Sequence, residues 1–287
     1  MLNRIGKWKV TALETGDFRL DGGAMMGSVP KVLWEKTNVA DELNRIDLSL
    51  RCLLLDDGSN KVLIETGMGD KLAPEFAQMF HVIQPKHPLK EKLADIGYKI
   101  EEITHVILTH LHFDHAGGAT TFDNDKNLIP TFPNAEYYVS NVNWNAGINP
   151  SPRDSASYLD FNYLPLEKST KLNLLTDNTK VFNGISTITV NGHTTGQQLI
   201  KIESNNDILV FCSDLIPLRS HLQLPWIMGY DLNAVLSLEE KTEFLKNAAK
   251  YNWWLWFYHD PATVAVRIKK GKKYYDVVEE VMRNGKS

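Results

Sequence analysis

The sequence contains little cysteine: Cys52 and Cys212 are the two among 287 residues. The disulfide framework that stabilises small secreted domains needs more cysteines than this, so that class of protein is excluded. Both cysteines stand in apolar stretches that are typical of strands. We therefore expect two buried free thiols rather than metal ligands.

The chain also lacks a long apolar run and a strong excess of either charge. No stretch reaches the roughly 18 apolar residues of a membrane span, and the first residues form no apolar signal core, which predicts a cytoplasmic protein without membrane attachment. The formal net charge is −4, so no basic surface for nucleic acid is expected, and we assign the basic run Lys269–Lys273 to a solvated hairpin end. The composition, 43% hydrophobic and 23% charged, indicates one globular domain over residues 1–287.

What the chain does contain is a dense group of metal-binding side chains. His110, His112, Asp114 and His115 directly follow the apolar run Val106–Leu108. Imidazole and carboxylate together suit zinc and related divalent metals. In an extended segment residues i and i+2 point the same way, so His110 and His112 are predicted to share one metal, which leaves Asp114 and His115 for a second. Surface histidines beside a turn-forming aspartate are the less favoured explanation of this spacing.

Three further donors stand just after predicted strands. His193 follows the strand ending at Val190, Asp214 follows an apolar strand with Ser213 between, and His259 follows the strand beginning at Trp253. Each has an ordinary explanation by itself, as a turn residue, a helix N-cap or a core histidine. Together with the first cluster they predict a dinuclear metal site.

The hydrophobic pattern predicts two β-rich halves flanked by helices. Strands are expected at Lys9–Leu13, Leu48–Leu55, Lys61–Glu65, Ile103–Leu108, Glu136–Val139, Val181–Val190, Leu199–Glu203, Ile208–Cys212, Trp253–Tyr258 and Val264–Ile268. Helices are expected at Asp70–Met79, Pro88–Ile96, after a cap at Ser140, from a capping box of Ser237 and Glu240 to Tyr251, and at Tyr274–Met282. This order predicts an α+β sandwich with the metal donors on its rim.

The motif His-x-His-x-Asp-His at 110–115 resembles the signature of the metallo-β-lactamase superfamily. The resemblance implies the four-layer αβ/βα sandwich of that superfamily. It implies that His110, His112 and His193 bind the first metal, that Asp114, His115 and His259 bind the second, and that Asp214 bridges the two. The true β-lactamases usually carry Cys at the position of Asp214, and flavodiiron proteins carry Glu at that of His112, so neither branch is favoured.

Within the superfamily, segments 20–30 and 225–231 resemble those of quorum-quenching N-acyl-homoserine lactone lactonases. The resemblance implies a small-molecule lactone or ester substrate and a homodimer. Adaptable methionine and flat tryptophan side chains are suited to an acyl-chain pocket, although ordinary loop packing is the alternative. The residues predicted to bind substrate are Met25, Met26, Val29, Trp34, Leu224, Trp226 and Ile227.

Several of these lactonases carry a tyrosine three residues after the bridging aspartate, where this chain has Pro217. We predict that His221 replaces it as the hydrogen-bond donor to the oxyanion, rather than being a surface histidine beside Arg219. A hydroxide bridging two metals would attack the lactone carbonyl, because metal coordination lowers the pKa of water towards about 7. Asp214 would hold the metals at bridging distance, and Asp114 would pass a proton to the leaving alkoxide.

The same donors leave other activities open. A phosphotriesterase or arylesterase would differ in the pocket alone. A glyoxalase-II-like thioesterase fits the segment 192–196 but needs a cationic site, for which Lys269–Lys273 is a thin candidate. A non-catalytic metal-binding protein is the third alternative. Two Zn²⁺ ions are the expected cofactors, although Mn, Fe or Co would suit these ligands too.

Overall fold

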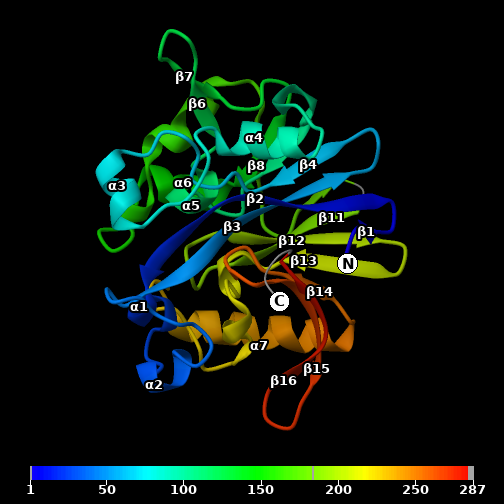
Figure 1. Ribbon diagram of the computed structural model, residues 1–287. Helices are drawn as coiled ribbons and strands as arrows, with labels where there is room; N and C mark the ends of the chain where they lie inside the picture. The colour runs from blue at the N-terminus through cyan, green and yellow to red at the C-terminus, as the bar shows by residue number, and fades with distance from the viewer. Residues whose placement is uncertain (1, 183, 284–287) are drawn as a thin grey trace. The chain divides into compact units, whose positions relative to one another are not determined.

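The computed structural model describes residues 2–182 and 184–283. Its strands form two seven-stranded sheets and one two-stranded ribbon (Figure 1). The first sheet has the order β1 (Arg4–Ile5), β2 (Trp8–Asp21), β3 (Arg45–Asp56), β4 (Lys61–Ile64), β5 (His105–Ile107), β8 (Glu136–Ser140) and β9 (Leu172–Leu175). The second has the order β10 (Lys180–Phe182), β11 (Ile185–Val190), β12 (Gln197–Ser204), β13 (Asp207–Phe211), β14 (Trp254–Trp256), β15 (Thr263–Lys270) and β16 (Tyr275–Met282). The ribbon pairs β6 (Thr120–Phe122) with β7 (Leu128–Pro130).

The helices are mostly short. They are α1 (Gly22–Met26), α2 (Lys31–Trp34), α3 (Pro74–Met79), α4 (Pro88–Asp95), α5 (Phe113–Ala116), α6 (Asn141–Ile148) and α7 (Ala234–Lys250), joined by 3₁₀ turns that include η5 (Ser213–Leu215) and η6 (Arg219–Leu222). Within residues 2–182 and 184–283, no helix combines the length and the apolar sequence needed to cross a bilayer.

The chain divides into two compact units. Unit 1 comprises Met1–Gly6, Phe18–Ser49 and Asn178–Ser287, and unit 2 comprises Lys7–Asp17 and Leu50–Asp177. Each unit contains one end of the long strands β2 and β3. The expectation of a single domain over 1–287 stays a prediction.

In unit 2, the strands β4, β5, β8 and β9 run parallel to one another. The residues of β4 and β5 are mostly Val, Ile and Leu, which suits strands with both faces covered. Helix α6 packs on β8 and β9 (Figure 1). The carboxyl end of β5 leads directly into the histidine cluster, because His110 stands three residues after Ile107 and α5 begins three residues further on, at Phe113.

In unit 1, helix α7 packs its apolar face on the second sheet (Figure 1). Phe244, Leu245 and Ala248 of α7 belong to a buried cluster with residues of β12 to β15. Strands β13 and β14 are parallel, with Phe211 opposite Trp256. This register brings the segments that follow the two strands to the same edge of the sheet.

Three predicted helix boundaries or assignments are wrong. Helix α3 begins at Pro74 rather than Asp70, because proline favours the first turn of a helix. Helix α7 begins at Ala234 with Asn233 as its N-cap, so Ser237 and Glu240 form no capping box. The predicted helix at Tyr274–Met282 is a strand, since residues 275–282 pair with β15 along its length. The prediction of one strand over Val181–Val190 is also wrong, because its two parts belong to the antiparallel strands β10 and β11. Asn183 between them lies outside the described residues.

Candidate metal centre

Unit 2 carries the dense motif, and its side chains converge in pairs. His110 and His112 lie on the extended segment after β5, with Nε2 of His110 3.0 Å from Nδ1 of His112. Asp114 and His115 lie on α5, with Oδ2 of Asp114 3.9 Å from Nε2 of His115. All four side chains are buried. The rings of His110 and His112 therefore lie together, and their sharing of one metal stays a prediction.

Glu65 adds a buried carboxylate to this cluster. It follows β4, with Oε1 3.5 Å from Nδ1 of His115 and accepting the backbone N–H of Thr109 at 3.1 Å. Its φ of 65° lies in the left-handed region, an uncommon conformation for a residue with a side chain. Glu65 is thus placed to orient the His115 ring, leaving Nε2 on the side of Asp114.

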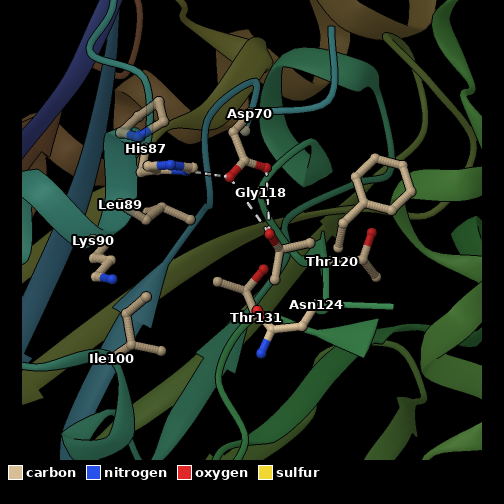
Figure 2. A pocket seen from close by; sticks show the side chains of 13 residues that line it. Asp70, His87, Leu89, Lys90, Ile100, Gly118, Thr120, Asn124 and Thr131 are labelled. Atoms are coloured by element: carbon tan, nitrogen blue, oxygen red, sulfur yellow. Dashed lines mark hydrogen bonds and ion pairs between the residues drawn. The ribbon is translucent and has the colours of Figure 1, made fainter. Parts of the chain in front are cut away.

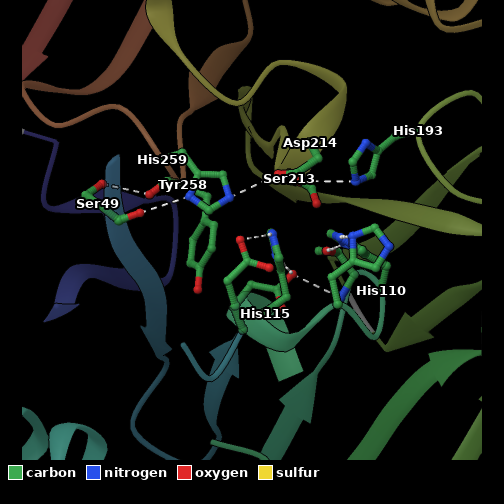
Figure 3. A network of polar contacts seen from close by, with 12 residues as sticks. Ser49, His110, His115, His193, Ser213, Asp214, Tyr258 and His259 are labelled. Atoms are coloured by element: carbon green, nitrogen blue, oxygen red, sulfur yellow. Dashed lines mark hydrogen bonds and ion pairs between the residues drawn. The ribbon is translucent and has the colours of Figure 1, made fainter. Parts of the chain in front are cut away.

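Unit 1 carries the other three predicted ligands, with Asp214 between two histidines (Figure 3). Oδ2 of Asp214 lies 3.3 Å from Nε2 of His193, and Oδ1 lies 3.4 Å from Nε2 of His259. Asp214 and His259 each stand three residues after a pair of residues, Phe211 and Trp256, that face each other on parallel strands. The register of β13 and β14 therefore explains why these side chains meet.

The outer nitrogens of both histidines are already occupied. Nδ1 of His193 lies 2.9 Å from a carboxylate oxygen of Asp231, and Nδ1 of His259 lies 3.0 Å from the carbonyl oxygen of Ser49. Carboxylates and carbonyls accept hydrogen bonds, so a ring of His193 or His259 with one proton would carry it on Nδ1. Nε2 then presents a lone pair to Asp214, which is also an acceptor.

In each pair, Nε2 of the histidine and the Asp214 oxygen would both be acceptors, 3.3 or 3.4 Å apart, and this fits a cation held between them. Histidine nitrogen and carboxylate oxygen are both zinc ligands, and an outer carboxylate or carbonyl on the second ring nitrogen is the usual arrangement in metal sites. The chemistry of His193, Asp214 and His259 therefore fits a metal ion.

His221 lies on η6 with 1% of its surface exposed. Its Nε2 lies 3.0 Å from the carbonyl oxygen of Met25, so Nε2 carries the proton, and Nδ1 has no hydrogen-bond partner among the described residues. Burial, with the Lys241 charge, lowers the pKa of His221 to about 3. In this tautomer the ring would accept a hydrogen bond through Nδ1. The role of His221 as oxyanion donor stays a prediction.

The residues predicted to bind substrate all lie in unit 1. Met25, Met26 and Trp34 are buried, whereas Val29 and Trp226 are partly exposed. Helix α1 packs on the segment that contains Ile227: Gly229 donates to the carbonyl of Ala24 at 2.8 Å. Leu224 packs against the apolar cluster under α7. The hydrogen bond from Gly229 to Ala24 joins segments 20–30 and 225–231. The role of the two segments in binding substrate stays a prediction.

Unit 2 also has a cavity of about 330 Å³ that contains none of the predicted ligands (Figure 2). Asp70 and His87 face each other in it, with Oδ2 of Asp70 2.9 Å from Nδ1 of His87. Leu89, Lys90 and Thr131 are among the other lining residues.

Sequence reasoning missed Glu65, Asp231 and the carbonyl of Ser49. Glu65 had one available signal, an acidic side chain at the carboxyl end of a buried strand. Asp231 and Ser49 had none, because each acts through a ring that is distant in the sequence.

The sequence profile of the Metallo-beta-lactamase superfamily matches residues 48–252. An N-acyl homoserine lactonase of Bacillus cereus is 28% identical over 177 residues, which are 58% of this chain and 63% of that lactonase. The match thus spans less than two thirds of the lactonase.

Two solved structures share the fold. A probable metal-dependent hydrolase from Staphylococcus aureus is 30% identical, with a TM-score of 0.90 over 98% of this chain and 99% of that one. The dizinc quorum-quenching lactonase AidC, in complex with a product, is 20% identical with a TM-score of 0.80 over 98% and 97%. These likenesses confirm the predicted α+β fold class and the predicted resemblance.

Proposed function

Because the chain belongs to the metallo-beta-lactamase superfamily, we propose that it opens the lactone ring of N-acyl-homoserine lactones with the help of two bound metals. The coarser activity, that of a metal-dependent hydrolase of this superfamily, follows from membership and from the donor residues. The observation that carries the metal requirement is Asp214, whose two oxygens face Nε2 of His193 and Nε2 of His259. The lactone class is supported by the likeness to the lactonase of Bacillus cereus.

We assign the metal ligands from the resemblance of the motif to that of the superfamily. His110, His112 and His193 would hold one metal and Asp114, His115 and His259 the other, with Asp214 shared. Zn²⁺ is the expected ion from the ligand types, although these ligands would also accept Mn, Fe or Co. When bound, such metals lower the pKa of water and polarise a carbonyl.

The remaining roles belong to the chain itself. Asp231 and the Ser49 carbonyl hold the rings of His193 and His259 with Nε2 facing Asp214. Asp114 would accept the proton that the attacking water loses and pass it to the alkoxide that leaves when the ring opens. The segments around Met25 and Trp226 would bind the acyl chain.

The proposal is tested by acid release from lactones of increasing acyl length. Protein of measured zinc content should open N-acyl-homoserine lactones, and His110→Ala should lose both zinc and turnover. His87→Ala is a matched control, because His87 is a histidine of the same unit that lies in the separate cavity. Turnover and bound zinc that survive His110→Ala would contradict the proposal.

The same panel includes a paraoxon-type phosphotriester, an aryl ester and a glutathione thioester. A zinc-loaded protein that hydrolyses one of these and leaves every lactone intact would retain the metal hydrolase and replace its substrate. Full zinc without turnover of any ester would favour the non-catalytic alternative.

A further inference from the structure

Glu240, on helix α7, contacts the loop that carries His193. Its carboxylate accepts two successive backbone N–H groups, from Asn191 at 2.7 Å to Oε1 and from Gly192 at 3.0 Å to Oε2. Hydrogen bonds to a charged acceptor are stronger than those between neutral groups. The two residues just before His193 are therefore fixed by one side chain.

The start of α7 holds the same loop by its backbone. Asn233 donates to the carbonyl of Gly192 at 2.9 Å, and Leu232 donates to that of His193 at 3.1 Å. A Cβ at Gly192 would lie 2.3 Å from Oγ of Ser237, so a glycine is needed for this close approach. The position of the His193 backbone thus depends on residues 232–240.

Lys241, the next residue, contacts a different segment. Its side chain is fully buried and donates to the carbonyls of Gln223 at 2.9 Å and Trp226 at 2.6 Å. Successive residues of an α-helix point about 100° apart, which lets Glu240 and Lys241 reach separate loops. Lys241 therefore fixes the segment that contains Leu224 and Trp226, both predicted to bind substrate.

We infer that Glu240 and Lys241 are positioning residues with separate targets: Glu240 holds the loop of the metal ligand His193, and Lys241 holds the substrate segment 223–226. The inference rests on the proposed function. Replacing Glu240 should therefore change zinc affinity and replacing Lys241 should change KM. The reason is that the contacts of Glu240 lead to a metal ligand and those of Lys241 do not.

The test compares Glu240→Ala with Lys241→Met in two measurements. Zinc affinity is measured on metal-free protein by competition with a chromophoric chelator, and kcat and KM are measured with N-hexanoyl-homoserine lactone at saturating zinc. We expect Glu240→Ala to weaken zinc binding by about 10- to 100-fold, the usual range for groups that orient metal ligands, with KM nearly unchanged. We expect Lys241→Met to raise KM by about tenfold, because the released segment must be ordered on binding, with zinc affinity nearly unchanged.

Conservative variants keep the test informative if a truncated side chain impairs folding. Glu240→Gln retains one acceptor oxygen, so it should weaken zinc binding less than Glu240→Ala does. Lys241→Gln retains an amide donor, so it should raise KM less than Lys241→Met does. Glu239→Ala, an exposed neighbour on α7, should change neither quantity. Thermal unfolding of the metal-free variants reports general loss of stability.

The inference is overturned if both variants change zinc affinity and KM together, or if neither changes its expected quantity. A wild-type protein that binds zinc but hydrolyses none of the substrates refutes the proposed function and the Lys241 half with it. The zinc titration alone then still decides the Glu240 half.

Discussion

Replacing Asp231 by Asn tests whether His193 is a metal ligand held by an outer carboxylate. The side chains of His193 and Asp231 are buried, with 4% and 5% of their surfaces exposed, respectively. Nδ1 of His193 lies 2.9 Å from Oδ1 of Asp231. Asparagine keeps the shape and an acceptor oxygen but removes the charge that makes the ring a better ligand. Loss of such a partner typically weakens metal binding by about 10- to 100-fold, which is about 1.4 to 2.8 kcal/mol.

The assay is a competition titration of metal-free protein with Zn²⁺, repeated for Asp231→Leu and for Asp123→Asn. The leucine variant leaves the Nδ1–H of His193 without its acceptor, so its loss should exceed that of asparagine. Asp123 lies in the exposed turn between β6 and β7, and its variant should bind zinc like the wild type. Zinc affinities that are equal in all four proteins would show that His193 does not need its carboxylate to bind zinc.

Three further predictions concern other parts of the structure. Glu65→Gln removes the charge beside His115 and should weaken zinc binding about tenfold in the same titration; unchanged affinity would contradict an orienting role. Gly192→Ala places a Cβ against Ser237 and should cost about 1 to 3 kcal/mol in urea unfolding, with loss of bound zinc; a variant as stable as the wild type would show that the loop can move. Burial lowers the pKa of Lys241 to about 7 from its ordinary 10.5. Between these two pH values the unfolded chain therefore binds more protons than the folded chain. The free energy of unfolding of the wild type, measured relative to that of Lys241→Met, should rise with pH across this window by at most about 5 kcal/mol. A flat or falling difference would mean that Lys241 keeps its ordinary pKa.

Much of the fold follows from local sequence. The apolar runs after which the metal donors stand are strands. Nε2 of His110 and Nδ1 of His112 lie 3.0 Å apart, and their sharing of one metal stays a prediction. The strand at 275–282 was not predicted, because Tyr275, Val277 and Glu279 take their conformation from pairing with β15 and not from local preference.

The supporting contacts of the site could not be predicted, since they join residues far apart in the sequence. The pattern of Ser237 and Glu240 indicates a capping box, yet Glu240 binds the backbone of residues 191 and 192. The tautomer of His221 likewise depends on the carbonyl of Met25, which no sequence pattern reveals. The roles of these side chains follow from tertiary contacts.

We propose that this chain is a metal-dependent lactonase. The most direct measurement is the rate of N-hexanoyl-homoserine lactone ring opening by one preparation of the wild-type protein before metal removal, after metal removal and after zinc is restored. We predict rapid opening, loss of turnover and recovery at about two zinc ions per chain. Lactone opening that continues in metal-free protein, or zinc-replete protein that opens no lactone, would contradict the proposed metal-dependent lactonase activity.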